Sequence, residues 1–452
     1  MTTIYAARWV LPSSTAPVLN GAIVVERERI VAVGDRSNLS EKFPDARFHD
    51  LGEAALLPGL VNVHSHLELT VMRGFLETKE ADFFAWLQKL TTARLERMTP
   101  EDLYVSAAWG ACEAARAGVT CLGDASEAAA ESMRALSDVG LRGTVYQESF
   151  GPDPRLASEN VEKLKAKVAA LRELETPLVR VGVSPHSPYT VCATQLKVIS
   201  EFALAESLPV MMHAAESAAE DLLVREGSGP FAEELAKRGI EWQTPGVSTI
   251  RYLERTGILR TKPLLAHCIR VDDADIETIK EADAKVAHCP KSNAKLGHGR
   301  AKYATFLKCG LDVGLGSDSV ASNNTCDLLE ESRFALLLAR SAMEPADARD
   351  LLTAAQTLRT ATLGGARSLG LASKIGEVRE GLQADFIAVA LNGAHQLPGY
   401  DPVSTLILAS SGRDVLLTVV AGREVYSDGR VTTIDEDGLR ARMIEIATKL
   451  QT

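Results

Sequence analysis

The sequence Leu60-Val61-Asn62-Val63-His64 is the first of eight apolar stretches that each end at or near a polar residue. The other seven cover residues 119–124, 144–148, 179–186, 210–213, 264–267, 285–288 and 312–318. These stretches do not alternate between apolar and polar positions, which is typical of parallel strands buried on both faces. The chain is therefore predicted to carry eight parallel strands.

Helical segments fit between these strands. Thr99-Pro100-Glu101 combines an N-cap residue, a proline in the first turn and an acidic residue, which predicts a helix start. Further helices are predicted over residues 158–175, 194–207 and 328–340. Eight β-α units favour an α/β fold, a closed (β/α)8 barrel of the TIM type. The competing architecture is an open doubly wound sheet, but no Gly-x-Gly-x-x-Gly turn follows the first strand.

The two ends of the chain have a different pattern from the middle. Short β-rich runs separated by turns occur at residues 22–25, 29–33, 384–389 and 416–420. Neither end has enough apolar surface to fold alone. We therefore expect one small β-rich domain assembled from residues 1–55 and 376–452, beside a barrel of residues 56–375.

Composition and charge exclude several classes of protein. The formal net charge of −11 gives an acidic surface that repels phosphate backbones, which argues against a nucleic-acid partner. Seven cysteines without any Cys-x-x-Cys argue against a disulfide framework and indicate reduced thiols in a cytoplasmic protein. No signal peptide and no membrane-spanning run are expected. A homo-oligomer is compatible with the sequence.

Polar residues gather where the predicted strands end. In a barrel, the C-terminal ends of all strands open onto one mouth, where the chemistry is done. The residues at these ends are His64, Asp124, Glu148, His186, His213, His267, His288 and Asp318. We therefore expect the functional site at this mouth.

His64 and His66 are the strongest candidates for metal ligands. Two histidines at positions i and i+2 of a strand point the same way, although such a pair alone is often incidental. His213 and Asp318 supply two further ligand types at other strand ends. Three imidazoles and one carboxylate suit Zn²⁺, or alternatively Fe²⁺, and leave a position open for water.

Two more residues complete the expected chemistry. Glu216 follows His213 by three residues and can shuttle a proton to the substrate, while His267 can orient or deprotonate the attacking water. A single such residue would more often be structural, but five at successive strand ends favour a catalytic site. His288 is interpreted as structural. His49, His298 and His395 are expected away from the mouth.

Together these motifs resemble the amidohydrolase superfamily, in its branch of cytosine, guanine and adenosine-derivative deaminases. The matching segments are Pro-Gly-Leu-Val-Asn-Val-His-Ser-His at 58–66, Ser-Pro-His-Ser-Pro-Tyr at 184–189, His-Ala-Ala-Glu at 213–216, His-Cys-Pro-Lys-Ser-Asn at 288–293, Gly-Ser-Asp-Ser-Val-Ala-Ser-Asn-Asn at 316–324 and Gly-Leu-Gln-Ala-Asp at 381–385. The resemblance implies one divalent metal ion held by His64, His66, His213 and Asp318. It also implies proton transfer by Glu216, His267 and Asp318, and substrate contact by His186.

Within this branch, S-adenosylhomocysteine and methylthioadenosine deaminases look similar, but they usually have a glutamate that holds ribose hydroxyls where this chain has Arg94. Phe84-Ala85-Trp86-Leu87 leading to Arg94, and Gln147-Glu148-Ser149-Phe150-Gly151, look more like aminodeoxyfutalosine deaminases of menaquinone biosynthesis. Arg94 could meet the carboxylate of such a substrate, and Glu148 is a second candidate for substrate binding. The alternative is a solvated Arg94 paired with Glu96 or Glu101.

The resemblance implies a hydrolase that replaces an aromatic amino group of an aminated purine nucleoside by oxygen, with 6-amino-6-deoxyfutalosine as one substrate. The alternatives are a deaminase of S-adenosylhomocysteine, methylthioadenosine or adenosine, and a triazine or guanine aminohydrolase. A non-enzymatic scaffold of the same fold is the third possibility, and the intact ligand set argues against it.

Overall fold

The computed structural model describes residues 2–79, 82–342 and 351–451. Eight parallel strands form two four-stranded sheets, β6-β7-β8-β9 and β10-β11-β12-β13. Parallel bridges from Ser65 to Asp318 and from Val183 to Val210 join the two sheets at both seams. The barrel therefore closes, as predicted. Its strands are β6 (Leu60–Ser65), β7 (Val119–Ser126), β8 (Arg142–Ser149), β9 (Val179–Pro185), β10 (Met211–Ala214), β11 (Leu264–His267), β12 (Lys285–His288) and β13 (Val313–Leu315).

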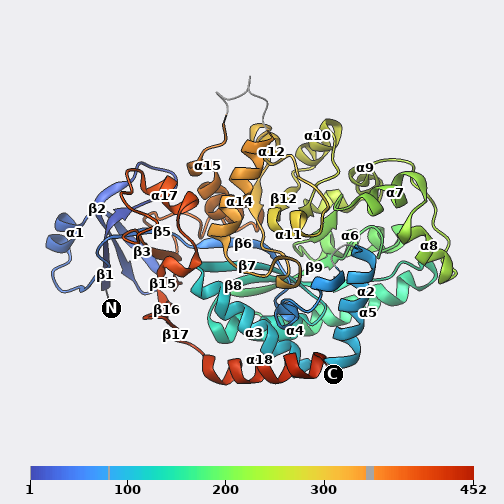
Figure 1. Ribbon diagram of the computed structural model, residues 1–452, viewed down its shortest axis with the longest axis horizontal. Coiled ribbons are helices and arrows are strands. Elements are labelled where there is room, and N and C mark those ends of the chain that lie inside the picture. The colour runs from blue at the N-terminus through green and yellow to red at the C-terminus, as the bar shows by residue number, and fades with distance from the viewer. Residues whose placement is uncertain (1, 80–81, 343–350, 452) are drawn as a thin grey trace.

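Helices surround the strands (Figure 1). The predicted helix start at Thr99 is confirmed, because its side chain accepts from the Asp102 amide while Asp102 caps Thr99 in return. The three other predicted helices are confirmed within a few residues. The helices are α2 (Phe83–Arg97), α3 (Pro100–Arg116), α4 (Ala129–Val139), α5 (Ala157–Arg172), α6 (Ala193–Ala205), α7 (Ala218–Glu226), α8 (Pro230–Lys237), α9 (Thr249–Arg255), α10 (Asp273–Glu281), α11 (Pro290–Lys295), α12 (Tyr303–Lys308), α13 (Val320–Asn323), α14 (Leu328–Ser341), α15 (Ala354–Arg359) and α16 (Gly365–Ser368).

The interior of the barrel is a packed core. Val61, Val63, Tyr146 and Met211 fill it from the strands, and Leu369 from the segment after α16 packs against them. This packing leaves the ends of the strands as the place for a site.

A third sheet, outside the barrel, joins the two ends of the chain, as predicted. Its order is β17-β16-β15-β14-β5-β1-β2-β3, with β4 beside β1, and the antiparallel pair β5–β14 connects the N-terminal and C-terminal parts. The strands are β1 (Thr2–Val10), β2 (Val18–Glu26), β3 (Arg29–Asp35), β4 (Arg47–Asp50), β5 (Ala54–Pro58), β14 (Phe386–Ala390), β15 (Val415–Val420), β16 (Arg423–Ser427) and β17 (Arg430–Val431), with helices α1 (Arg36–Lys42) and α17 (Pro402–Leu408) alongside. The domain limits at residues 55/56 and 375/376 stay a proposal.

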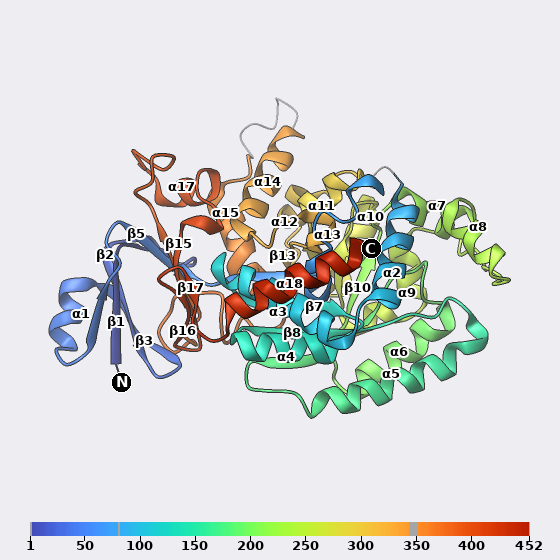
Figure 2. The same ribbon diagram turned by 60° about the horizontal axis from the view of Figure 1, so that its bottom comes forward.

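The last helix, α18 (Glu436–Gln451), leaves this sheet and packs along α3 of the barrel (Figure 2). Arg116 of α3 pairs with Glu436 at 2.7 Å, and Lys449 pairs with Asp102 at 2.8 Å. Arg97 at the end of α2 donates to the Leu450 carbonyl. Both ends of α18 are therefore fastened to the barrel.

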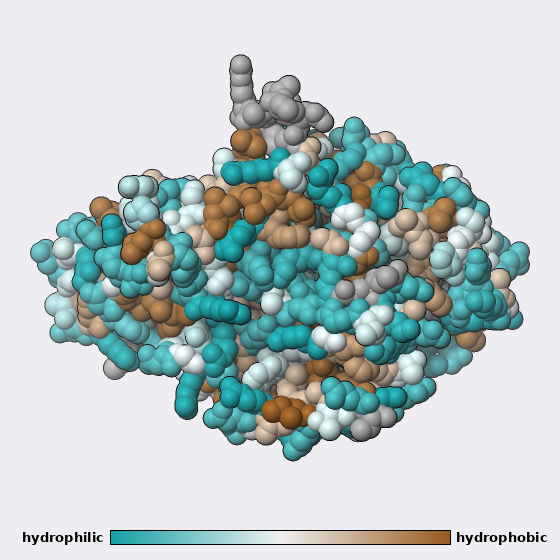
Figure 3. Space-filling model, viewed as in Figure 1, coloured by the Kyte–Doolittle hydropathy of each residue, from teal (hydrophilic) through white to brown (hydrophobic). Residues whose placement is uncertain are grey.

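The surface is mostly hydrophilic on the face of Figure 1, with a hydrophobic patch over α14 and α15 (Figure 3). Leu337 of α14 is 49% exposed. No helix among the described residues is long and apolar enough to cross a lipid bilayer.

Candidate metal centre and active site

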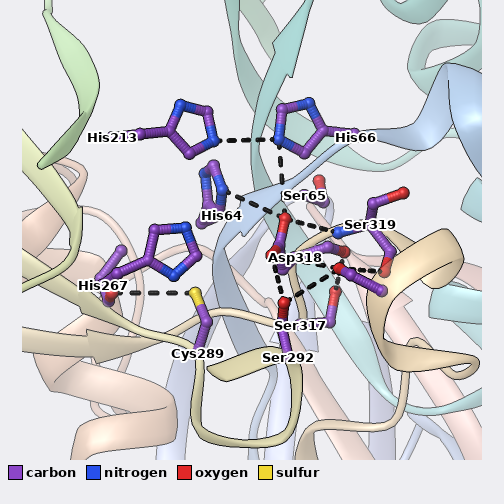
Figure 4. Close-up of polar contacts among 12 residues, drawn as sticks. His64, Ser65, His66, His213, His267, Cys289, Ser292, Ser317, Asp318 and Ser319 are labelled. Atoms are coloured by element: carbon purple, nitrogen blue, oxygen red, sulfur yellow. Dashed lines mark hydrogen bonds and ion pairs between the residues drawn. The ribbon is translucent and has the colours of Figure 1, made fainter. Parts of the chain in front are cut away.

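His64 and His66 stand at the end of β6, with their rings directed to a common point (Figure 4). The structure places His213, from the end of β10, beside them: its Nε2 lies 3.3 Å from Nε2 of His66. Oδ1 of Asp318 lies 3.4 Å from Nε2 of His64 and 3.6 Å from Nε2 of His66. The four predicted ligands thus come together from three strand ends.

Asp318 reaches this point through a strained backbone. Its φ is +59°, a left-handed conformation that is uncommon outside glycine. Two residues earlier, a side chain on Gly316 would come within 2.8 Å of Cβ of His64, so only glycine lets this segment approach β6. Oδ2 of Asp318 accepts hydrogen bonds from the hydroxyls of Ser292 at 2.6 Å and Ser322 at 3.2 Å. These contacts fix the carboxylate.

The imidazoles are oriented by their second nitrogen atoms. Nδ1 of His213 donates to the carbonyl oxygen of His186 at 2.9 Å, which directs Nε2 into the site. Nδ1 of His267 lies 2.8 Å from Oδ1 of Asn293, so Nε2 of His267 also faces the site. Asn293 ends the motif at 288–293, but no pattern in the sequence marks it as a partner of His267.

Burial sets the charge states of these groups. It lowers the pKa of His66 to about 3 and that of His213 well below its usual value, so both imidazoles are neutral. Burial alone would raise the pKa of Asp318, but its interaction with the nearby His64 brings it well below its usual value. Neutral imidazoles and an ionised carboxylate are the forms that bind a cation.

This donor set fits a divalent metal ion. One ligand atom each from His64, His66 and His213 lie within 4.8 Å of one another, and the same holds for His64, His267 and Asp318. Nε2 of His64 and of His267 are buried without a hydrogen-bond partner among the described residues. Buried nitrogens of this kind are costly unless something binds them.

Glu216 and His267 lie together beside this centre. Oε1 of Glu216 is 3.6 Å from Nε2 of His267, and both side chains are almost fully buried. Burial raises the pKa of Glu216, which favours its protonated form. Burial would lower the pKa of His267, but the nearby Glu216 and Asp318 raise it overall. The arrangement can accept, hold and release a proton.

His298 was expected away from the mouth, and this expectation was wrong. Its Nε2 lies 3.7 Å from Oε1 of Glu216, because the segment after α11 returns over the barrel. His288 is buried and stacks on Tyr303 with ring centroids 4.8 Å apart, and it does not line the cavity at the mouth. His49 and His395 lie in the small sheet and its loops.

A cavity of about 450 Å³ opens above this centre. The polar groups lining it include the predicted substrate-binding residues His186, Glu216, Arg94 and Glu148. Apolar and aromatic side chains form much of the remaining wall, among them Leu69, Phe83, Trp86, Leu87, Leu90, Phe150, Tyr189 and Leu296. Such a wall suits a flat heterocycle.

Arg94 lines the cavity but is paired with acids from other segments. It donates to Oε1 of Glu68 at 3.2 Å and contacts Glu127, with only 10% of its side chain exposed. The partners proposed from the sequence, Glu96 and Glu101, are therefore wrong. Burial and the nearby Glu68 raise the pKa of Glu148 well above its usual value. Glu68 and Glu127 carry no signal in the sequence as partners of Arg94, because only the fold brings them to it.

His186 and Glu148 stand at the ends of β9 and β8, on the side of His213. One ligand atom each from these three residues lie within 4.8 Å of one another. Nδ1 of His186 is held by Thr190 at 2.8 Å, whereas Oε1 of Glu148 is buried with no hydrogen-bond partner among the described residues. Both side chains can therefore contact a ligand in the cavity.

Comparisons with known proteins identify relatives of this chain over nearly its whole length. The chain is 32% identical over 439 residues to a 5-methylthioadenosine/S-adenosylhomocysteine deaminase of Syntrophobacter fumaroxidans, covering 95% of this chain and 94% of that one. Its structure is similar to an adenosine deaminase of Xanthomonas campestris with bound zinc, with a TM-score of 0.85, 26% identity and coverage of 99% and 98%. A zinc complex of an atrazine chlorohydrolase from Arthrobacter aurescens has the same fold, with a TM-score of 0.84, 22% identity and coverage of 98% and 100%.

Family models match two segments. A short one, residues 21–46, matches an imidazolonepropionase-like composite domain of bacteria. Residues 55–425, most of the chain, match the amidohydrolase family. The chain therefore belongs to the amidohydrolase family and is a hydrolase.

Proposed function

We propose that this hydrolase deaminates an aminated purine nucleoside, replacing the exocyclic amino group of the ring by oxygen and releasing ammonia. The observation that carries this proposal is the pairing of Glu216 with His267 at 3.6 Å beside three imidazoles and Asp318, under an aromatic-lined cavity. The relative from Syntrophobacter fumaroxidans, named for two such nucleosides, supports the substrate class.

The proposed metal ligands are His64, His66, His213 and Asp318. A divalent ion held there, Zn²⁺ in the first place and Fe²⁺ as the alternative, would supply a water-derived nucleophile at neutral pH. The four side chains position that chemistry beneath the cavity, beside its apolar wall.

Glu216 and His267 are proposed to move the protons. Nε2 of His267 accepts a proton from the attacking water, because Asn293 holds its other nitrogen. Glu216 holds a proton and donates it to the ring nitrogen next to the attacked carbon. Asp318 accepts the second proton of the water oxygen on Oδ1, while serine hydroxyls fix Oδ2, and passes it to the amino group, which leaves as ammonia. His267 then returns its proton to Glu216, 3.6 Å away.

Substrate contacts are proposed for His186 and Glu148, and a supporting role is proposed for Arg94. The buried Oε1 of Glu148 faces no other described partner and can bind a hydroxyl group of the substrate. Arg94 neutralises Glu68 and Glu127, so its charge is already matched within the protein. Its role is therefore to hold this acidic wall in place.

A carboxylated nucleoside such as 6-amino-6-deoxyfutalosine is the second candidate substrate. Its support is Arg238, which also lines the cavity, is exposed, and forms no ion pair with any residue that the structure describes. A substrate carboxylate could pair with this exposed guanidinium.

That the protein forms a homo-oligomer, and which metal ion it binds, also stay proposals.

The test is a screen for ammonia release over aminated purines, nucleosides, pterins and triazines. We expect turnover of 5-methylthioadenosine, S-adenosylhomocysteine or 6-amino-6-deoxyfutalosine. Turnover of a triazine or of guanine alone would overturn the nucleoside proposal while leaving the hydrolase in place.

Two variants separate the roles of the arginines. Arg94→Met should lower the turnover of adenosine and of a carboxylated nucleoside alike, because it leaves the buried Glu68 and the half-buried Glu127 without their cation. Arg238→Met should raise KM only for the carboxylated nucleoside, by about fivefold, which is the scale of a partly exposed ion pair. If Arg94→Met instead loses activity only on the carboxylated nucleoside, Arg94 and not Arg238 binds the substrate carboxylate.

A further inference from the structure

Glu220 is a fully buried acid near the site, and the proposed reaction does not use it. It lies in the first turn of α7, three residues after the N-cap Ser217, whose side chain accepts from the Glu220 amide at 3.2 Å. Ser-x-x-Glu is the pattern of a capping box, in which the glutamate would return to the Ser217 amide. Glu220 does something else.

The Glu220 carboxylate reaches past the cap to the end of β10. Its Oε1 accepts from the amide of Ala215 at 2.8 Å, and its Oε2 accepts from the amide of Glu216 at 2.9 Å. The hydroxyl of Thr249 in α9 donates to Oε1 at 2.9 Å and fixes the carboxylate from the far side. Two consecutive amides are thus held by one side chain.

The segment held in this way is strained. Ala215 has a φ of +53°, in the left-handed region, and its carbonyl accepts from the amides of Ile269 and Arg270 at 2.8 Å each. This turn sets the direction in which the Glu216 side chain leaves the backbone. A residue in such a conformation persists only when its surroundings hold it.

We propose that Glu220 is a positioning residue: its carboxylate clamps the amides of Ala215 and Glu216, and so aims the Glu216 carboxyl at His267 and the cavity. This inference rests on the proposed function, because it takes Glu216 as the proton carrier. Glu220 itself does not line the cavity.

Glu220→Gln tests the clamp without removing its bulk. An amide side chain keeps one acceptor oxygen but turns an NH2 group towards the second backbone amide, so one of the two contacts is lost. We expect kcat to fall by about tenfold to a hundredfold, the scale for a misplaced catalytic group, with KM and metal content nearly unchanged. Glu226→Gln, the same change at the exposed end of α7, is the matched control and should leave kcat unaltered.

A double-variant cycle shows whether Glu220 acts through Glu216. If it does, adding Glu220→Gln to Glu216→Gln should cost little further activity, because the group that it aims is already disabled. If the losses of kcat in the two single variants multiply in the double variant, the proposal is overturned. An unchanged kcat in Glu220→Gln would also overturn it.

A readout without substrate separates this proposal from the proposed function. Hydrogen exchange of the amides of Ala215 and Glu216 should be faster in Glu220→Gln than in Glu226→Gln. Faster exchange with no deaminase activity in the parent enzyme would uphold the clamp and reject the proposed function. Unchanged exchange would reject the clamp whatever the substrate.

Discussion

At the scale of single residues, Glu216 carries the proposed proton transfer. Glu216→Gln keeps the size and polarity of the side chain but cannot carry a proton. We expect normal metal content and turnover lower by about a hundredfold or more, the usual scale for a lost acid–base group. Metal analysis and steady-state kinetics on the substrate found in the screen check this. Near-normal turnover would show that Glu216 is structural.

The burial of Glu331 should make the free energy of unfolding depend on pH. It is fully buried in α14, where burial raises its pKa from 4.5 to about 8. The folded state therefore holds the proton more tightly than the unfolded chain does. The contribution of Glu331 to the free energy of unfolding is therefore largest below pH 4.5. It decreases as the pH rises towards 8, by at most about 1.4 kcal/mol per pH unit.

Glu331→Gln should remove this decrease, so that the variant gains stability relative to the parent between pH 6 and 9. Urea unfolding at several pH values measures the difference. The neighbouring Glu330→Gln is the control with the opposite sign. Burial alone would raise the pKa of Glu330, but its contact with Lys291 lowers it, so its contribution is lost on acidification. Parallel pH curves for Glu331→Gln and the parent would contradict the expectation.

At the scale of elements, α18 braces the wall of the cavity. It packs on α3 and contacts α2, the helix that carries Trp86, Leu90 and Arg94 into the cavity wall. Ile446 of α18 is 3% exposed, whereas Ile444 is 62% exposed. The two residues offer the same substitution on opposite sides of one helix.

Ile446→Ala should lower the free energy of unfolding by about 2–4 kcal/mol, because it leaves a cavity between α18 and the barrel. Ile444→Ala should change it by less than about 0.5 kcal/mol, as is usual for exposed positions. Denaturant unfolding of both variants provides the comparison. Equal losses in the two variants would mean that packing of Ile446 against the barrel does not stabilise α18, because Ile→Ala by itself favours helix formation.

At the scale of the whole molecule, the proposed metal ligands link the two halves of the barrel. His64 and His66 belong to the sheet β6-β7-β8-β9, whereas His213 belongs to β10-β11-β12-β13 and Asp318 follows β13. An ion bound by all four ties both sheets together, and it stabilises the folded state by mass action.

We expect about one divalent ion per chain. Its removal by a chelator should abolish activity and lower Tm, and added Zn²⁺ should restore both. His213→Ala should lose metal and activity together. Elemental analysis and thermal unfolding provide the measurements, and full metal occupancy in His213→Ala would reject the ligand assignment.

The sequence by itself determined the barrel and the place of its site. Buried parallel strands are apolar on both faces, and their ends are marked by polar residues, so both features are local and can be read in order along the chain. The same holds for His64 and His66, whose common direction follows from the two-residue period of a strand. It also holds for the small sheet, because two ends that cannot fold alone must combine.

The tertiary structure alone decided which side chains meet across the mouth. Arg94 finds Glu68 and Glu127, which are 26 and 33 residues away, and not the nearby Glu96 or Glu101. His298 reaches Glu216, and Glu220 turns from its own helix cap to the strand before it. Helical and strand periods fix only the direction of a side chain from its own backbone. The partner of a buried charge depends on which loops the closed barrel brings together, and on the cost of leaving that charge unpaired.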